Sequence, residues 1–288
     1  MKKILGLTLA VAMVLSVAGC SSNSGSSSPA STPAAEASSP KDEATDTEKD
    51  KWVMAINATF PPFESIDEND ATKFVGVDID IANHIAEKMG VELEINDMQF
   101  SALVPTMTSG RADIIVSGIS PTEERLEVID FSKPYFFPMN AIICSAETDF
   151  KTLNELEGKK IGVSMGTSYA NVAKTVAGAE VMELDSTPLV IQEILNGRCD
   201  AGIFDATQAT EFCKENEGLT YTIIPSDITL GDTFAIAVPK GAGYLDDINT
   251  ILDEMKEDGS MHDIFVKWLG EDATAQYEAS IADLEIAK

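Results

Sequence analysis

The sequence predicts an α/β fold made of two lobes of related design. Short apolar runs typical of buried strands alternate with helical segments, a pattern that favours mainly parallel sheets flanked by helices. One unit of this pattern occurs twice: a helical stretch ends at a Gly-Arg-x-Asp sequence, and an apolar strand follows, at 103–116 and again at 188–204. The 238 residues from 51 to 288 give room for two lobes of ordinary domain size.

Residues 1–19 have the features of an export signal. Two lysines precede an apolar run, Ile4 to Ala18, that is shorter than the roughly 20 residues needed to span a bilayer. Small residues then lead into Cys20, which resembles the bacterial lipoprotein signal, in which this cysteine becomes the lipidated first residue. We therefore expect two lipid groups, a diacylglycerol and an acyl chain such as palmitate, to anchor Cys20 to the membrane. A plain signal peptide with an accidental cysteine is the alternative.

The segment after this cysteine is expected to be a tether. Residues 21–50 are rich in Ser, Ala, Thr and Pro and then become acidic. No apolar period occurs there, so the segment cannot bury enough surface to offset the entropy of ordering its backbone. Residues 20–50 are thus interpreted as a lipidated cysteine followed by a flexible link to the folded part.

The folded part divides into alternating elements. In the first lobe we expect strands at 52–56, 74–77, 91–95 and 114–116, with helices at 79–89 and 103–109. In the second lobe we expect strands at 160–164, 181–184 and 201–204, with helices at 168–177 and 188–196. Sheets of this kind bind ligands beyond the carboxyl ends of their strands. Each Gly-Arg-x-Asp unit therefore delivers the residues after its strand to a cleft between the lobes.

A cation and an anion are delivered to this cleft. Ser120-Pro121-Thr122-Glu123 reads as a capping box with proline at the first helical position, so a helix with a free, positive N-terminus is expected to begin there. Arg125 follows, with a planar fork that suits a carboxylate. Asp205, after the second strand, accepts hydrogen bonds and suits an ammonium. This charge pattern fits a zwitterion such as an α-amino acid. A salt bridge of Arg125 with Glu123 or Glu124 is the alternative.

An aromatic side chain is expected beside these charges. The sequence Thr59-Phe60-Pro61-Pro62-Phe63 follows the first strand, and its prolines stiffen the loop. Phe60 is therefore predicted to present an apolar plate to the ligand, with a place in the core as the alternative. For Phe63 the core is the expected place.

Several blocks of the chain are similar to the family 3 extracellular solute-binding proteins, the amino-acid receptors of ABC importers. The most specific are Gly118-Ile-Ser-Pro-Thr-Glu-Glu-Arg125 and Asp130-Phe-Ser-Lys-Pro-Tyr135. Further blocks are 60–64, 75–80, 100–105, 162–168, 197–205 and 258–270, so that the resemblance covers essentially all of 51–288.

This resemblance implies a type II periplasmic-binding-protein fold, in which two α/β lobes joined by a two-strand hinge close on a ligand. The hinge strands are expected near 138–144 and 234–238. The first lobe then comprises 51–138 plus 235–288, and the second 139–234.

The resemblance also implies the role of each pocket residue. The ligand carboxylate is assigned to Arg125, Ser120 and Ser168, and the ligand ammonium to Asp205, Gly118 and Ser117. The ligand side chain is assigned to Phe60, Phe100, Asn57 and Ser164. Asp78 and Asp80 are expected to cap the start of a helix, with ligand contact as the alternative.

The expected ligand is a polar, uncharged amino acid such as glutamine, or a compound like cystine. Family members that take cationic side chains can carry an acid at the position of Asn57, where this chain has an amide. No second basic residue is evident in the pocket blocks, which makes an acidic ligand the least expected.

Composition argues against other partners. The net charge of −28 disfavours binding to nucleic acid. Only two histidines exist, His84 and His262, and both are expected to be surface or packing residues. No catalytic or metal-binding motif is present, so we expect no catalytic residue, no metal and no cofactor. Three cysteines remain after Cys20, an odd number that leaves a free thiol and leaves open whether Cys199 and Cys213 pair.

Three functions are compatible with these features. The favoured one is a monomeric, lipid-anchored receptor on the outer side of the cell membrane that hands an amino acid to the permease of an ABC importer. A sensor that passes ligand occupancy to a membrane kinase or chemoreceptor is the second. An enzyme like the cyclohexadienyl dehydratases of this fold is the third, and it needs a proton donor that Asn57, Phe60 and Ser164 do not supply.

Overall fold

The computed structural model describes residues 51–224 and 233–282. The predicted export signal, the lipidated Cys20 and the tether lie outside the described residues. Within the described ranges, none of the helices combines the length and the apolar character that a membrane span requires.

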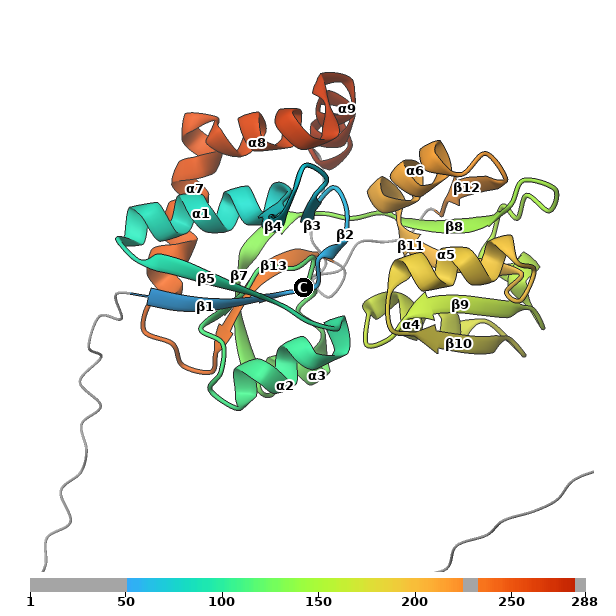
Figure 1. Ribbon diagram of the computed structural model, residues 1–288, viewed down its shortest axis with the longest axis horizontal. Helices are drawn as coiled ribbons and strands as arrows, with labels where there is room; N and C mark the ends of the chain where they lie inside the picture. Colours follow the sequence, from blue (N-terminus) through green and yellow to red (C-terminus); the bar gives the residue numbers. More distant parts are fainter. Residues whose placement is uncertain (1–50, 225–232, 283–288) are drawn as a thin grey trace, which may run out of the picture. The chain divides into compact units, whose positions relative to one another are not determined.

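The first sheet has five strands in the order β5-β1-β6-β13-β7 (Figure 1). Strand β1 pairs in parallel with β5 and β6, whereas β13 pairs antiparallel with β6 and β7. The bounds are β1 Lys51–Ile56, β5 Glu92–Asp97, β6 Ile114–Ile115, β7 Ile129–Phe136 and β13 Phe234–Pro239.

The second sheet repeats this plan in the order β10-β9-β11-β8-β12. Strand β9 pairs in parallel with β10 and β11, and β8 pairs antiparallel with β11 and β12. The bounds are β8 Asn140–Ser145, β9 Lys160–Ser164, β10 Glu180–Leu184, β11 Ala201–Asp205 and β12 Leu219–Ile223.

Both sheets are mixed, but four of the five strands in each run in the same direction, as expected of mainly parallel sheets, and only β13 and β8 run opposite. The chain leaves the first sheet after β7, crosses through 137–139 and enters the second at β8. It returns from β12 to β13 through 224–233, most of which lies outside the described residues. The strand that follows each crossing, β8 or β13, pairs antiparallel with both of its neighbours.

A small third sheet corrects one prediction. Its strands β2 Thr59–Phe60, β3 Glu64–Asp67 and β4 Asp70–Val75 are all antiparallel. The strand expected at 74–77 is thus the end of a hairpin and not a member of the main sheet. The turn between β3 and β4 is too short for a helical crossover, which a parallel neighbour would need.

Four predicted helices are confirmed within two residues at each end, namely α1 Val77–Met89, α2 Leu103–Thr108, α4 Ser168–Thr175 and α5 Thr187–Leu195. Short 3₁₀ turns occur at Phe100–Ala102 and Leu153–Leu156. The remaining helices are α3 Glu123–Leu126, α6 Ala206–Glu215, α7 Leu245–Asp258, α8 Ser260–Leu269 and α9 Glu271–Ile281.

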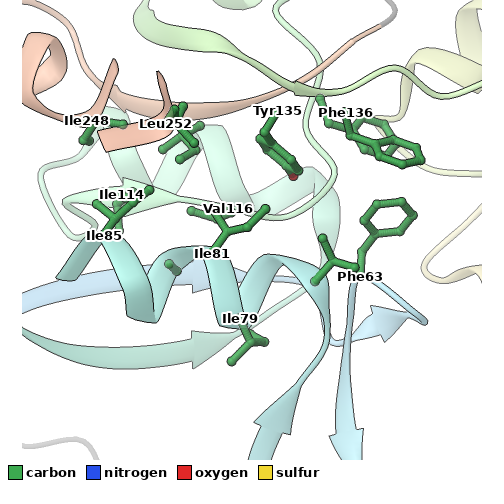
Figure 2. Close-up of a cluster of buried hydrophobic side chains, with 14 of the residues drawn as sticks. Phe63, Ile79, Ile81, Ile85, Ile114, Val116, Tyr135, Phe136, Ile248 and Leu252 are labelled. Atoms are coloured by element: carbon green, nitrogen blue, oxygen red, sulfur yellow. The ribbon is translucent and has the colours of Figure 1, made fainter. Parts of the chain in front are cut away.

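The main core lies between the first sheet and α1, α7, α8 and α9. Isoleucines at one-turn spacing on α1, Ile81 and Ile85, face Ile114 and Val116 at and beyond β6 and the apolar face of α7 (Figure 2). Tyr135 and Phe136 from β7 lie in the same cluster. A second cluster, around Leu103 on α2, packs on the opposite face of the sheet. Because both faces are covered, the sheet is a rigid platform for the residues that follow its strands.

Gly76 is predicted to be intolerant of any side chain. Its φ is 139°, and a Cβ at this position would lie 2.0 Å from the carbonyl oxygen of Phe63. We expect Gly76→Ala to lower the free energy of unfolding by about 3 kcal/mol or more in urea titrations, because backbone has to move. Gly90→Ala is the control: its φ is 71° but its Cβ meets nothing within 4 Å, so a loss of about 1 kcal/mol is expected. Equal losses in the two variants would contradict this account.

Candidate functional site

One cavity is lined by residues that follow strands of both five-stranded sheets. From the first sheet and its loops come Asn57, Phe60, Phe100, Ser117, Gly118, Ser120 and Arg125. From the second come Ser164, Thr167, Ser168, Tyr169, Thr187, Ile203, Phe204 and Gln208. The cavity thus holds nine of the ten residues predicted to contact a ligand; the exception is Asp205.

Arg125 is the charged side chain of this cavity. It is 9% exposed, and its guanidinium donates to the carbonyl oxygens of Ser120 and Gly166, each at 2.7 Å. The guanidinium carbon lies 5.4 Å from the centre of the Phe100 ring. Burial lowers the pKa of Arg125 to about 10. Within 51–224 and 233–282 no carboxylate forms a salt bridge with it, so the alternative, a pairing with Glu123 or Glu124, does not occur there.

The helix expected to begin at Ser120 begins later. Helix α3 covers only Glu123–Leu126, and the side chain of Thr122 caps it by accepting from the Arg125 backbone N–H at 3.4 Å. Ser120 uses its carbonyl oxygen for the Thr122 N–H and for the Arg125 guanidinium. The predicted capping box is therefore wrong, because a tight turn separates Ser120 from the helix. With four residues, α3 offers no extended dipole, and the positive charge of this site is that of Arg125.

Asp205 is the last residue of β11 and directly precedes α6. Its Oδ1 caps that helix by accepting from the backbone N–H groups of Thr207 at 2.8 Å and Gln208 at 3.1 Å. Its Oδ2 is buried and has no hydrogen-bond partner in the described part of the chain. Burial raises the pKa of Asp205 to about 6 against the opposing effect of the cap. A buried carboxylate oxygen without a partner is costly, and a cationic donor would relieve this cost.

Buried acids support the first-sheet side of the cavity. The Ser117 hydroxyl accepts from the Asn57 N–H at 3.0 Å and donates to Glu64 at 2.5 Å. Asp78 accepts from the Gly118 N–H at 2.7 Å and from the Tyr135 hydroxyl at 2.8 Å.

The prediction that Asp78 and Asp80 cap a helix is wrong. The residue before α1 is Gly76, and α1 has no side-chain cap. The carboxylate of Asp78 is directed to Gly118 and Tyr135, and that of Asp80 accepts from Lys267 at 2.6 Å and Trp268 at 2.7 Å. Each acid has stronger partners in the tertiary structure than the first turn of its own helix offers.

Aromatic rings close the apolar side of the cavity. Phe60 lies half-buried on the cavity and stacks on Phe63, with ring centres 4.9 Å apart. Phe63 is fully buried, which confirms its expected place in the core. Gly118 faces the Phe60 ring so closely that a Cβ there would lie 2.4 Å from it. The missing side chain at Gly118 thus allows Phe60 to reach the cavity.

Sequence reasoning missed six residues of the second lobe. Thr167, Tyr169, Thr187 and Gln208 add polar groups to the cavity, and Ile203 and Phe204 add apolar surface. Thr187 and Gln208 lie in the first turns of α5 and α6, which follow strands β10 and β11. The rule that ligands bind beyond the carboxyl ends of strands points to such positions, but it does not say which side chain turns inward.

The cavity offers hydrogen bonds and one positive charge. No Asp, Glu, His, Lys or Cys side chain lines it in the described ranges, and these ranges contain no cluster of three metal-ligating side chains. All three described cysteines, Cys144, Cys199 and Cys213, are free thiols. His262, expected to be a surface or packing residue, is exposed, and its Nδ1 lies 2.8 Å from Oε1 of Glu278.

Comparison with known proteins gives one consistent result. Residues 52–271 match the family described as bacterial extracellular solute-binding proteins, family 3. The arginine-binding extracellular protein ArtP of Bacillus subtilis (strain 168) is 30% identical over 272 residues, which cover 93% of this chain and 98% of that protein.

Solved structures agree. An ancestral arginine-binding protein bound to arginine is 38% identical with a TM-score of 0.71, over 77% of this chain and 99% of that chain. A structure of an ancestral arginine-binding protein bound to glutamine is 40% identical with a TM-score of 0.71, again over 77% of this chain and 99% of that chain. The type II periplasmic-binding-protein fold expected from the sequence is thereby confirmed.

The unpartnered Asp205 carboxylate should make the ligand-free protein less stable as the pH rises. Its pKa is near 3.8 when unfolded and about 6 when folded, so the folded state holds the proton longer and loses about 3 kcal/mol of stability across this window. Asp205→Asn keeps the capping oxygen but has no proton to release. Urea titrations should therefore show Asp205→Asn gaining up to that amount over the wild type between pH 4 and pH 7. A difference that does not change with pH would contradict the burial of an unpaired charge.

Proposed function

Because the chain belongs to the bacterial extracellular solute-binding proteins of family 3, we propose that it is a receptor that binds one amino acid and delivers it to an ABC importer. The amino acid lies in the cavity, between a lobe of residues 51–138 plus 235–288 and a lobe of residues 139–234. The observation that carries the proposal is the pair of incomplete charges: a buried guanidinium without a carboxylate, and a buried carboxylate oxygen without a donor.

The α-carboxylate is bound by Arg125, with Ser120 and Ser168 beside it. Two of the five guanidinium N–H groups donate to backbone carbonyls, which leaves donors for a planar anion. Ser120 and Ser168 line the same cavity, one from each lobe.

The α-ammonium is bound by Asp205, with the Gly118 carbonyl and Ser117. The free Oδ2 of Asp205 gains a charged hydrogen bond in this arrangement. The Ser117 hydroxyl donates its proton to Glu64, so toward a ligand it is an acceptor, as an ammonium requires.

The ligand side chain lies among Phe60, Phe100, Asn57 and Ser164. Gln208 and Thr187 add neutral polar groups, and the described lining holds no acid that would pair with a cationic side chain. A polar, uncharged side chain such as that of glutamine is therefore the favoured ligand. Arginine is the principal alternative, since similar proteins bind it.

We also propose that the protein is not an enzyme. The relatives it matches carry the names of binding proteins. General acid catalysis needs a proton donor on the cavity, and the described lining has no carboxyl, histidine or lysine side chain for that role.

The place of action is the outer side of the cell membrane, where Cys20 carries the lipid anchor and the tether lets the receptor reach its permease. Ligand contacts in both lobes drive closure about the two hinge strands, near 138–144 and 234–238. Arg125 already contacts Gly166 across the cavity, so a ligand on Arg125 couples both lobes.

Substitution of Arg125 is predicted to abolish tight binding. A charged hydrogen bond contributes about 1.5–3 kcal/mol, so Arg125→Ala should weaken amino-acid affinity by about tenfold to more than a hundredfold in calorimetric titrations. The ligand is first found by thermal shift with glutamine, arginine, histidine and cystine. Arg111→Ala, which removes an exposed arginine bonded to Ser109, is the matched control and should bind as the wild type does. Full affinity in Arg125→Ala would refute the site.

Lipid anchoring is predicted to depend on Cys20 alone. In cell fractionation, Cys20→Ala should move the protein from the membrane to the soluble or secreted fraction, because residues 21–50 contain no other cysteine that could carry the lipid. Metabolic labelling with a palmitate analogue should mark the wild type and not the variant. A labelled variant, or one that stays in the membrane fraction, would argue against lipidation at this residue.

A further inference from the structure

Two acids lie side by side in the core beneath the cavity. Glu64, at the start of β3, and Asp78, in the first turn of α1, are both 0% exposed. The backbone N–H of Asp78 donates to the carbonyl oxygen of Phe63, the residue before Glu64, at 2.9 Å. The carboxyl groups bond to adjacent residues, that of Glu64 to Ser117 and that of Asp78 to Gly118, so the two acids are neighbours. No Lys, Arg or His side chain in the described ranges bonds to either acid.

The hydrogen bonds around the pair have a fixed direction. The Ser117 hydroxyl accepts from the Asn57 N–H, so its own proton goes to Oε1 of Glu64. Asp78 accepts twice, from the Gly118 N–H at 2.7 Å and the Tyr135 hydroxyl at 2.8 Å. The other oxygen of Glu64, Oε2, is buried and has no hydrogen-bond partner within the described residues. A proton on that oxygen completes the network.

Burial and the neighbouring negative charges favour one proton on the pair of Glu64 and Asp78. Burial and the negative charge of Asp78 hold the pKa of Glu64 well above its usual range, and Asp97 adds to this effect. Burial raises the pKa of Asp78 as well, but bonds from Glu64, Tyr135 and Gly118 favour its charged form. Tyr135 stays neutral, because burial and both acids raise the pKa of its hydroxyl. Asp97 accepts from the Ala58 N–H at 2.8 Å.

We propose that Glu64 is protonated at neutral pH, donates this proton to Asp78, and with it positions the ammonium side of the binding cavity. The inference rests on the proposed function, since Asn57, Ser117 and Gly118 are the cavity residues that the pair holds. Glu64 and Asp78 are thus positioning residues that do not touch the ligand. The pair carries a single negative charge beneath Gly118, on the side where an ammonium binds.

Glu64→Gln tests the proton directly, because glutamine has the shape and hydrogen-bonding pattern of a protonated glutamate. Its amide can donate to Asp78, and its carbonyl can accept from Ser117. The variant should fold, and its amino-acid affinity should stay within about threefold of the wild type. Asp78→Asn is the contrasting variant: it loses the charge and an acceptor for Gly118 or Tyr135, so its affinity should fall by at least tenfold.

The pH dependence of unfolding gives a readout that needs no ligand. A glutamate whose pKa is raised on folding keeps its proton in the folded state and releases it on unfolding above about pH 4.5. Its stabilising contribution is therefore lost as the pH rises. Between pH 5 and 7 the unfolding equilibrium constant of the wild type should rise about tenfold per pH unit relative to that of Glu64→Gln. The contribution of Asp205 is common to both proteins and cancels.

Infrared spectroscopy supplies the second readout. The wild type at pH 7.5 should show the carbonyl band of a protonated, buried carboxylic acid, and Glu64→Gln should lack it. Parallel pH profiles, a missing band, or a Glu64→Gln variant that does not fold would each overturn the shared proton. If no amino acid binds to the wild type, the proposed function fails, while the band and the pH profile still decide the protonation of Glu64.

Discussion

A guanidinium held away from water is the constraint on which the binding site depends. Arg125 is bonded to one carbonyl on the first-sheet side, Ser120, and to one on the second-sheet side, Gly166. Neutral carbonyls stabilise a buried cation less than a carboxylate does, so in the proposed receptor the carboxylate of the ligand completes the arrangement. Arg125 can donate to both carbonyls only when the loops that carry Ser120 and Gly166 lie beside each other. Ligand binding at Arg125 therefore depends on the relative position of the two sheets.

The acids supply the complementary half of the same design. One carboxylate oxygen of Asp205 caps α6, and the other has no hydrogen-bond partner among the described residues. The pair of Glu64 and Asp78 places one negative charge next to the backbone N–H of Gly118. The cavity itself is lined by neutral polar groups and rings, in which the single cation is Arg125 among the described residues. Arg125 is thus the charged group on the cavity wall, and in the proposed receptor the neutral lining is left to distinguish side chains.

The sequence allowed four helices and nine of the fifteen residues that line the cavity to be predicted, but not the hydrogen-bond network around it. The helical stretches with glycine stops, such as Ile79–Met89, lie within two residues of their predicted ends, because local periodicity determines them. Local rules failed where tertiary partners compete. Ser120 gives its carbonyl to Arg125 and caps no helix, and Asp78 binds Gly118, forty residues away, in place of its own first turn. The antiparallel pairing of β8 and β13 likewise joins strands that are far apart in the sequence, and it has no local signal.

Blocking the two ends of the ligand would test most directly whether the two incomplete charges form one site for a zwitterion. Once the bound amino acid is identified, its affinity is compared by calorimetry with those of its α-carboxamide and its N-acetyl derivative. Each derivative removes one charge and keeps the side chain, so both should bind at least about tenfold to a hundredfold more weakly. If either derivative binds as tightly as the free amino acid, the corresponding end of the ligand is not held by Arg125 or by Asp205, and the account of the cavity is wrong.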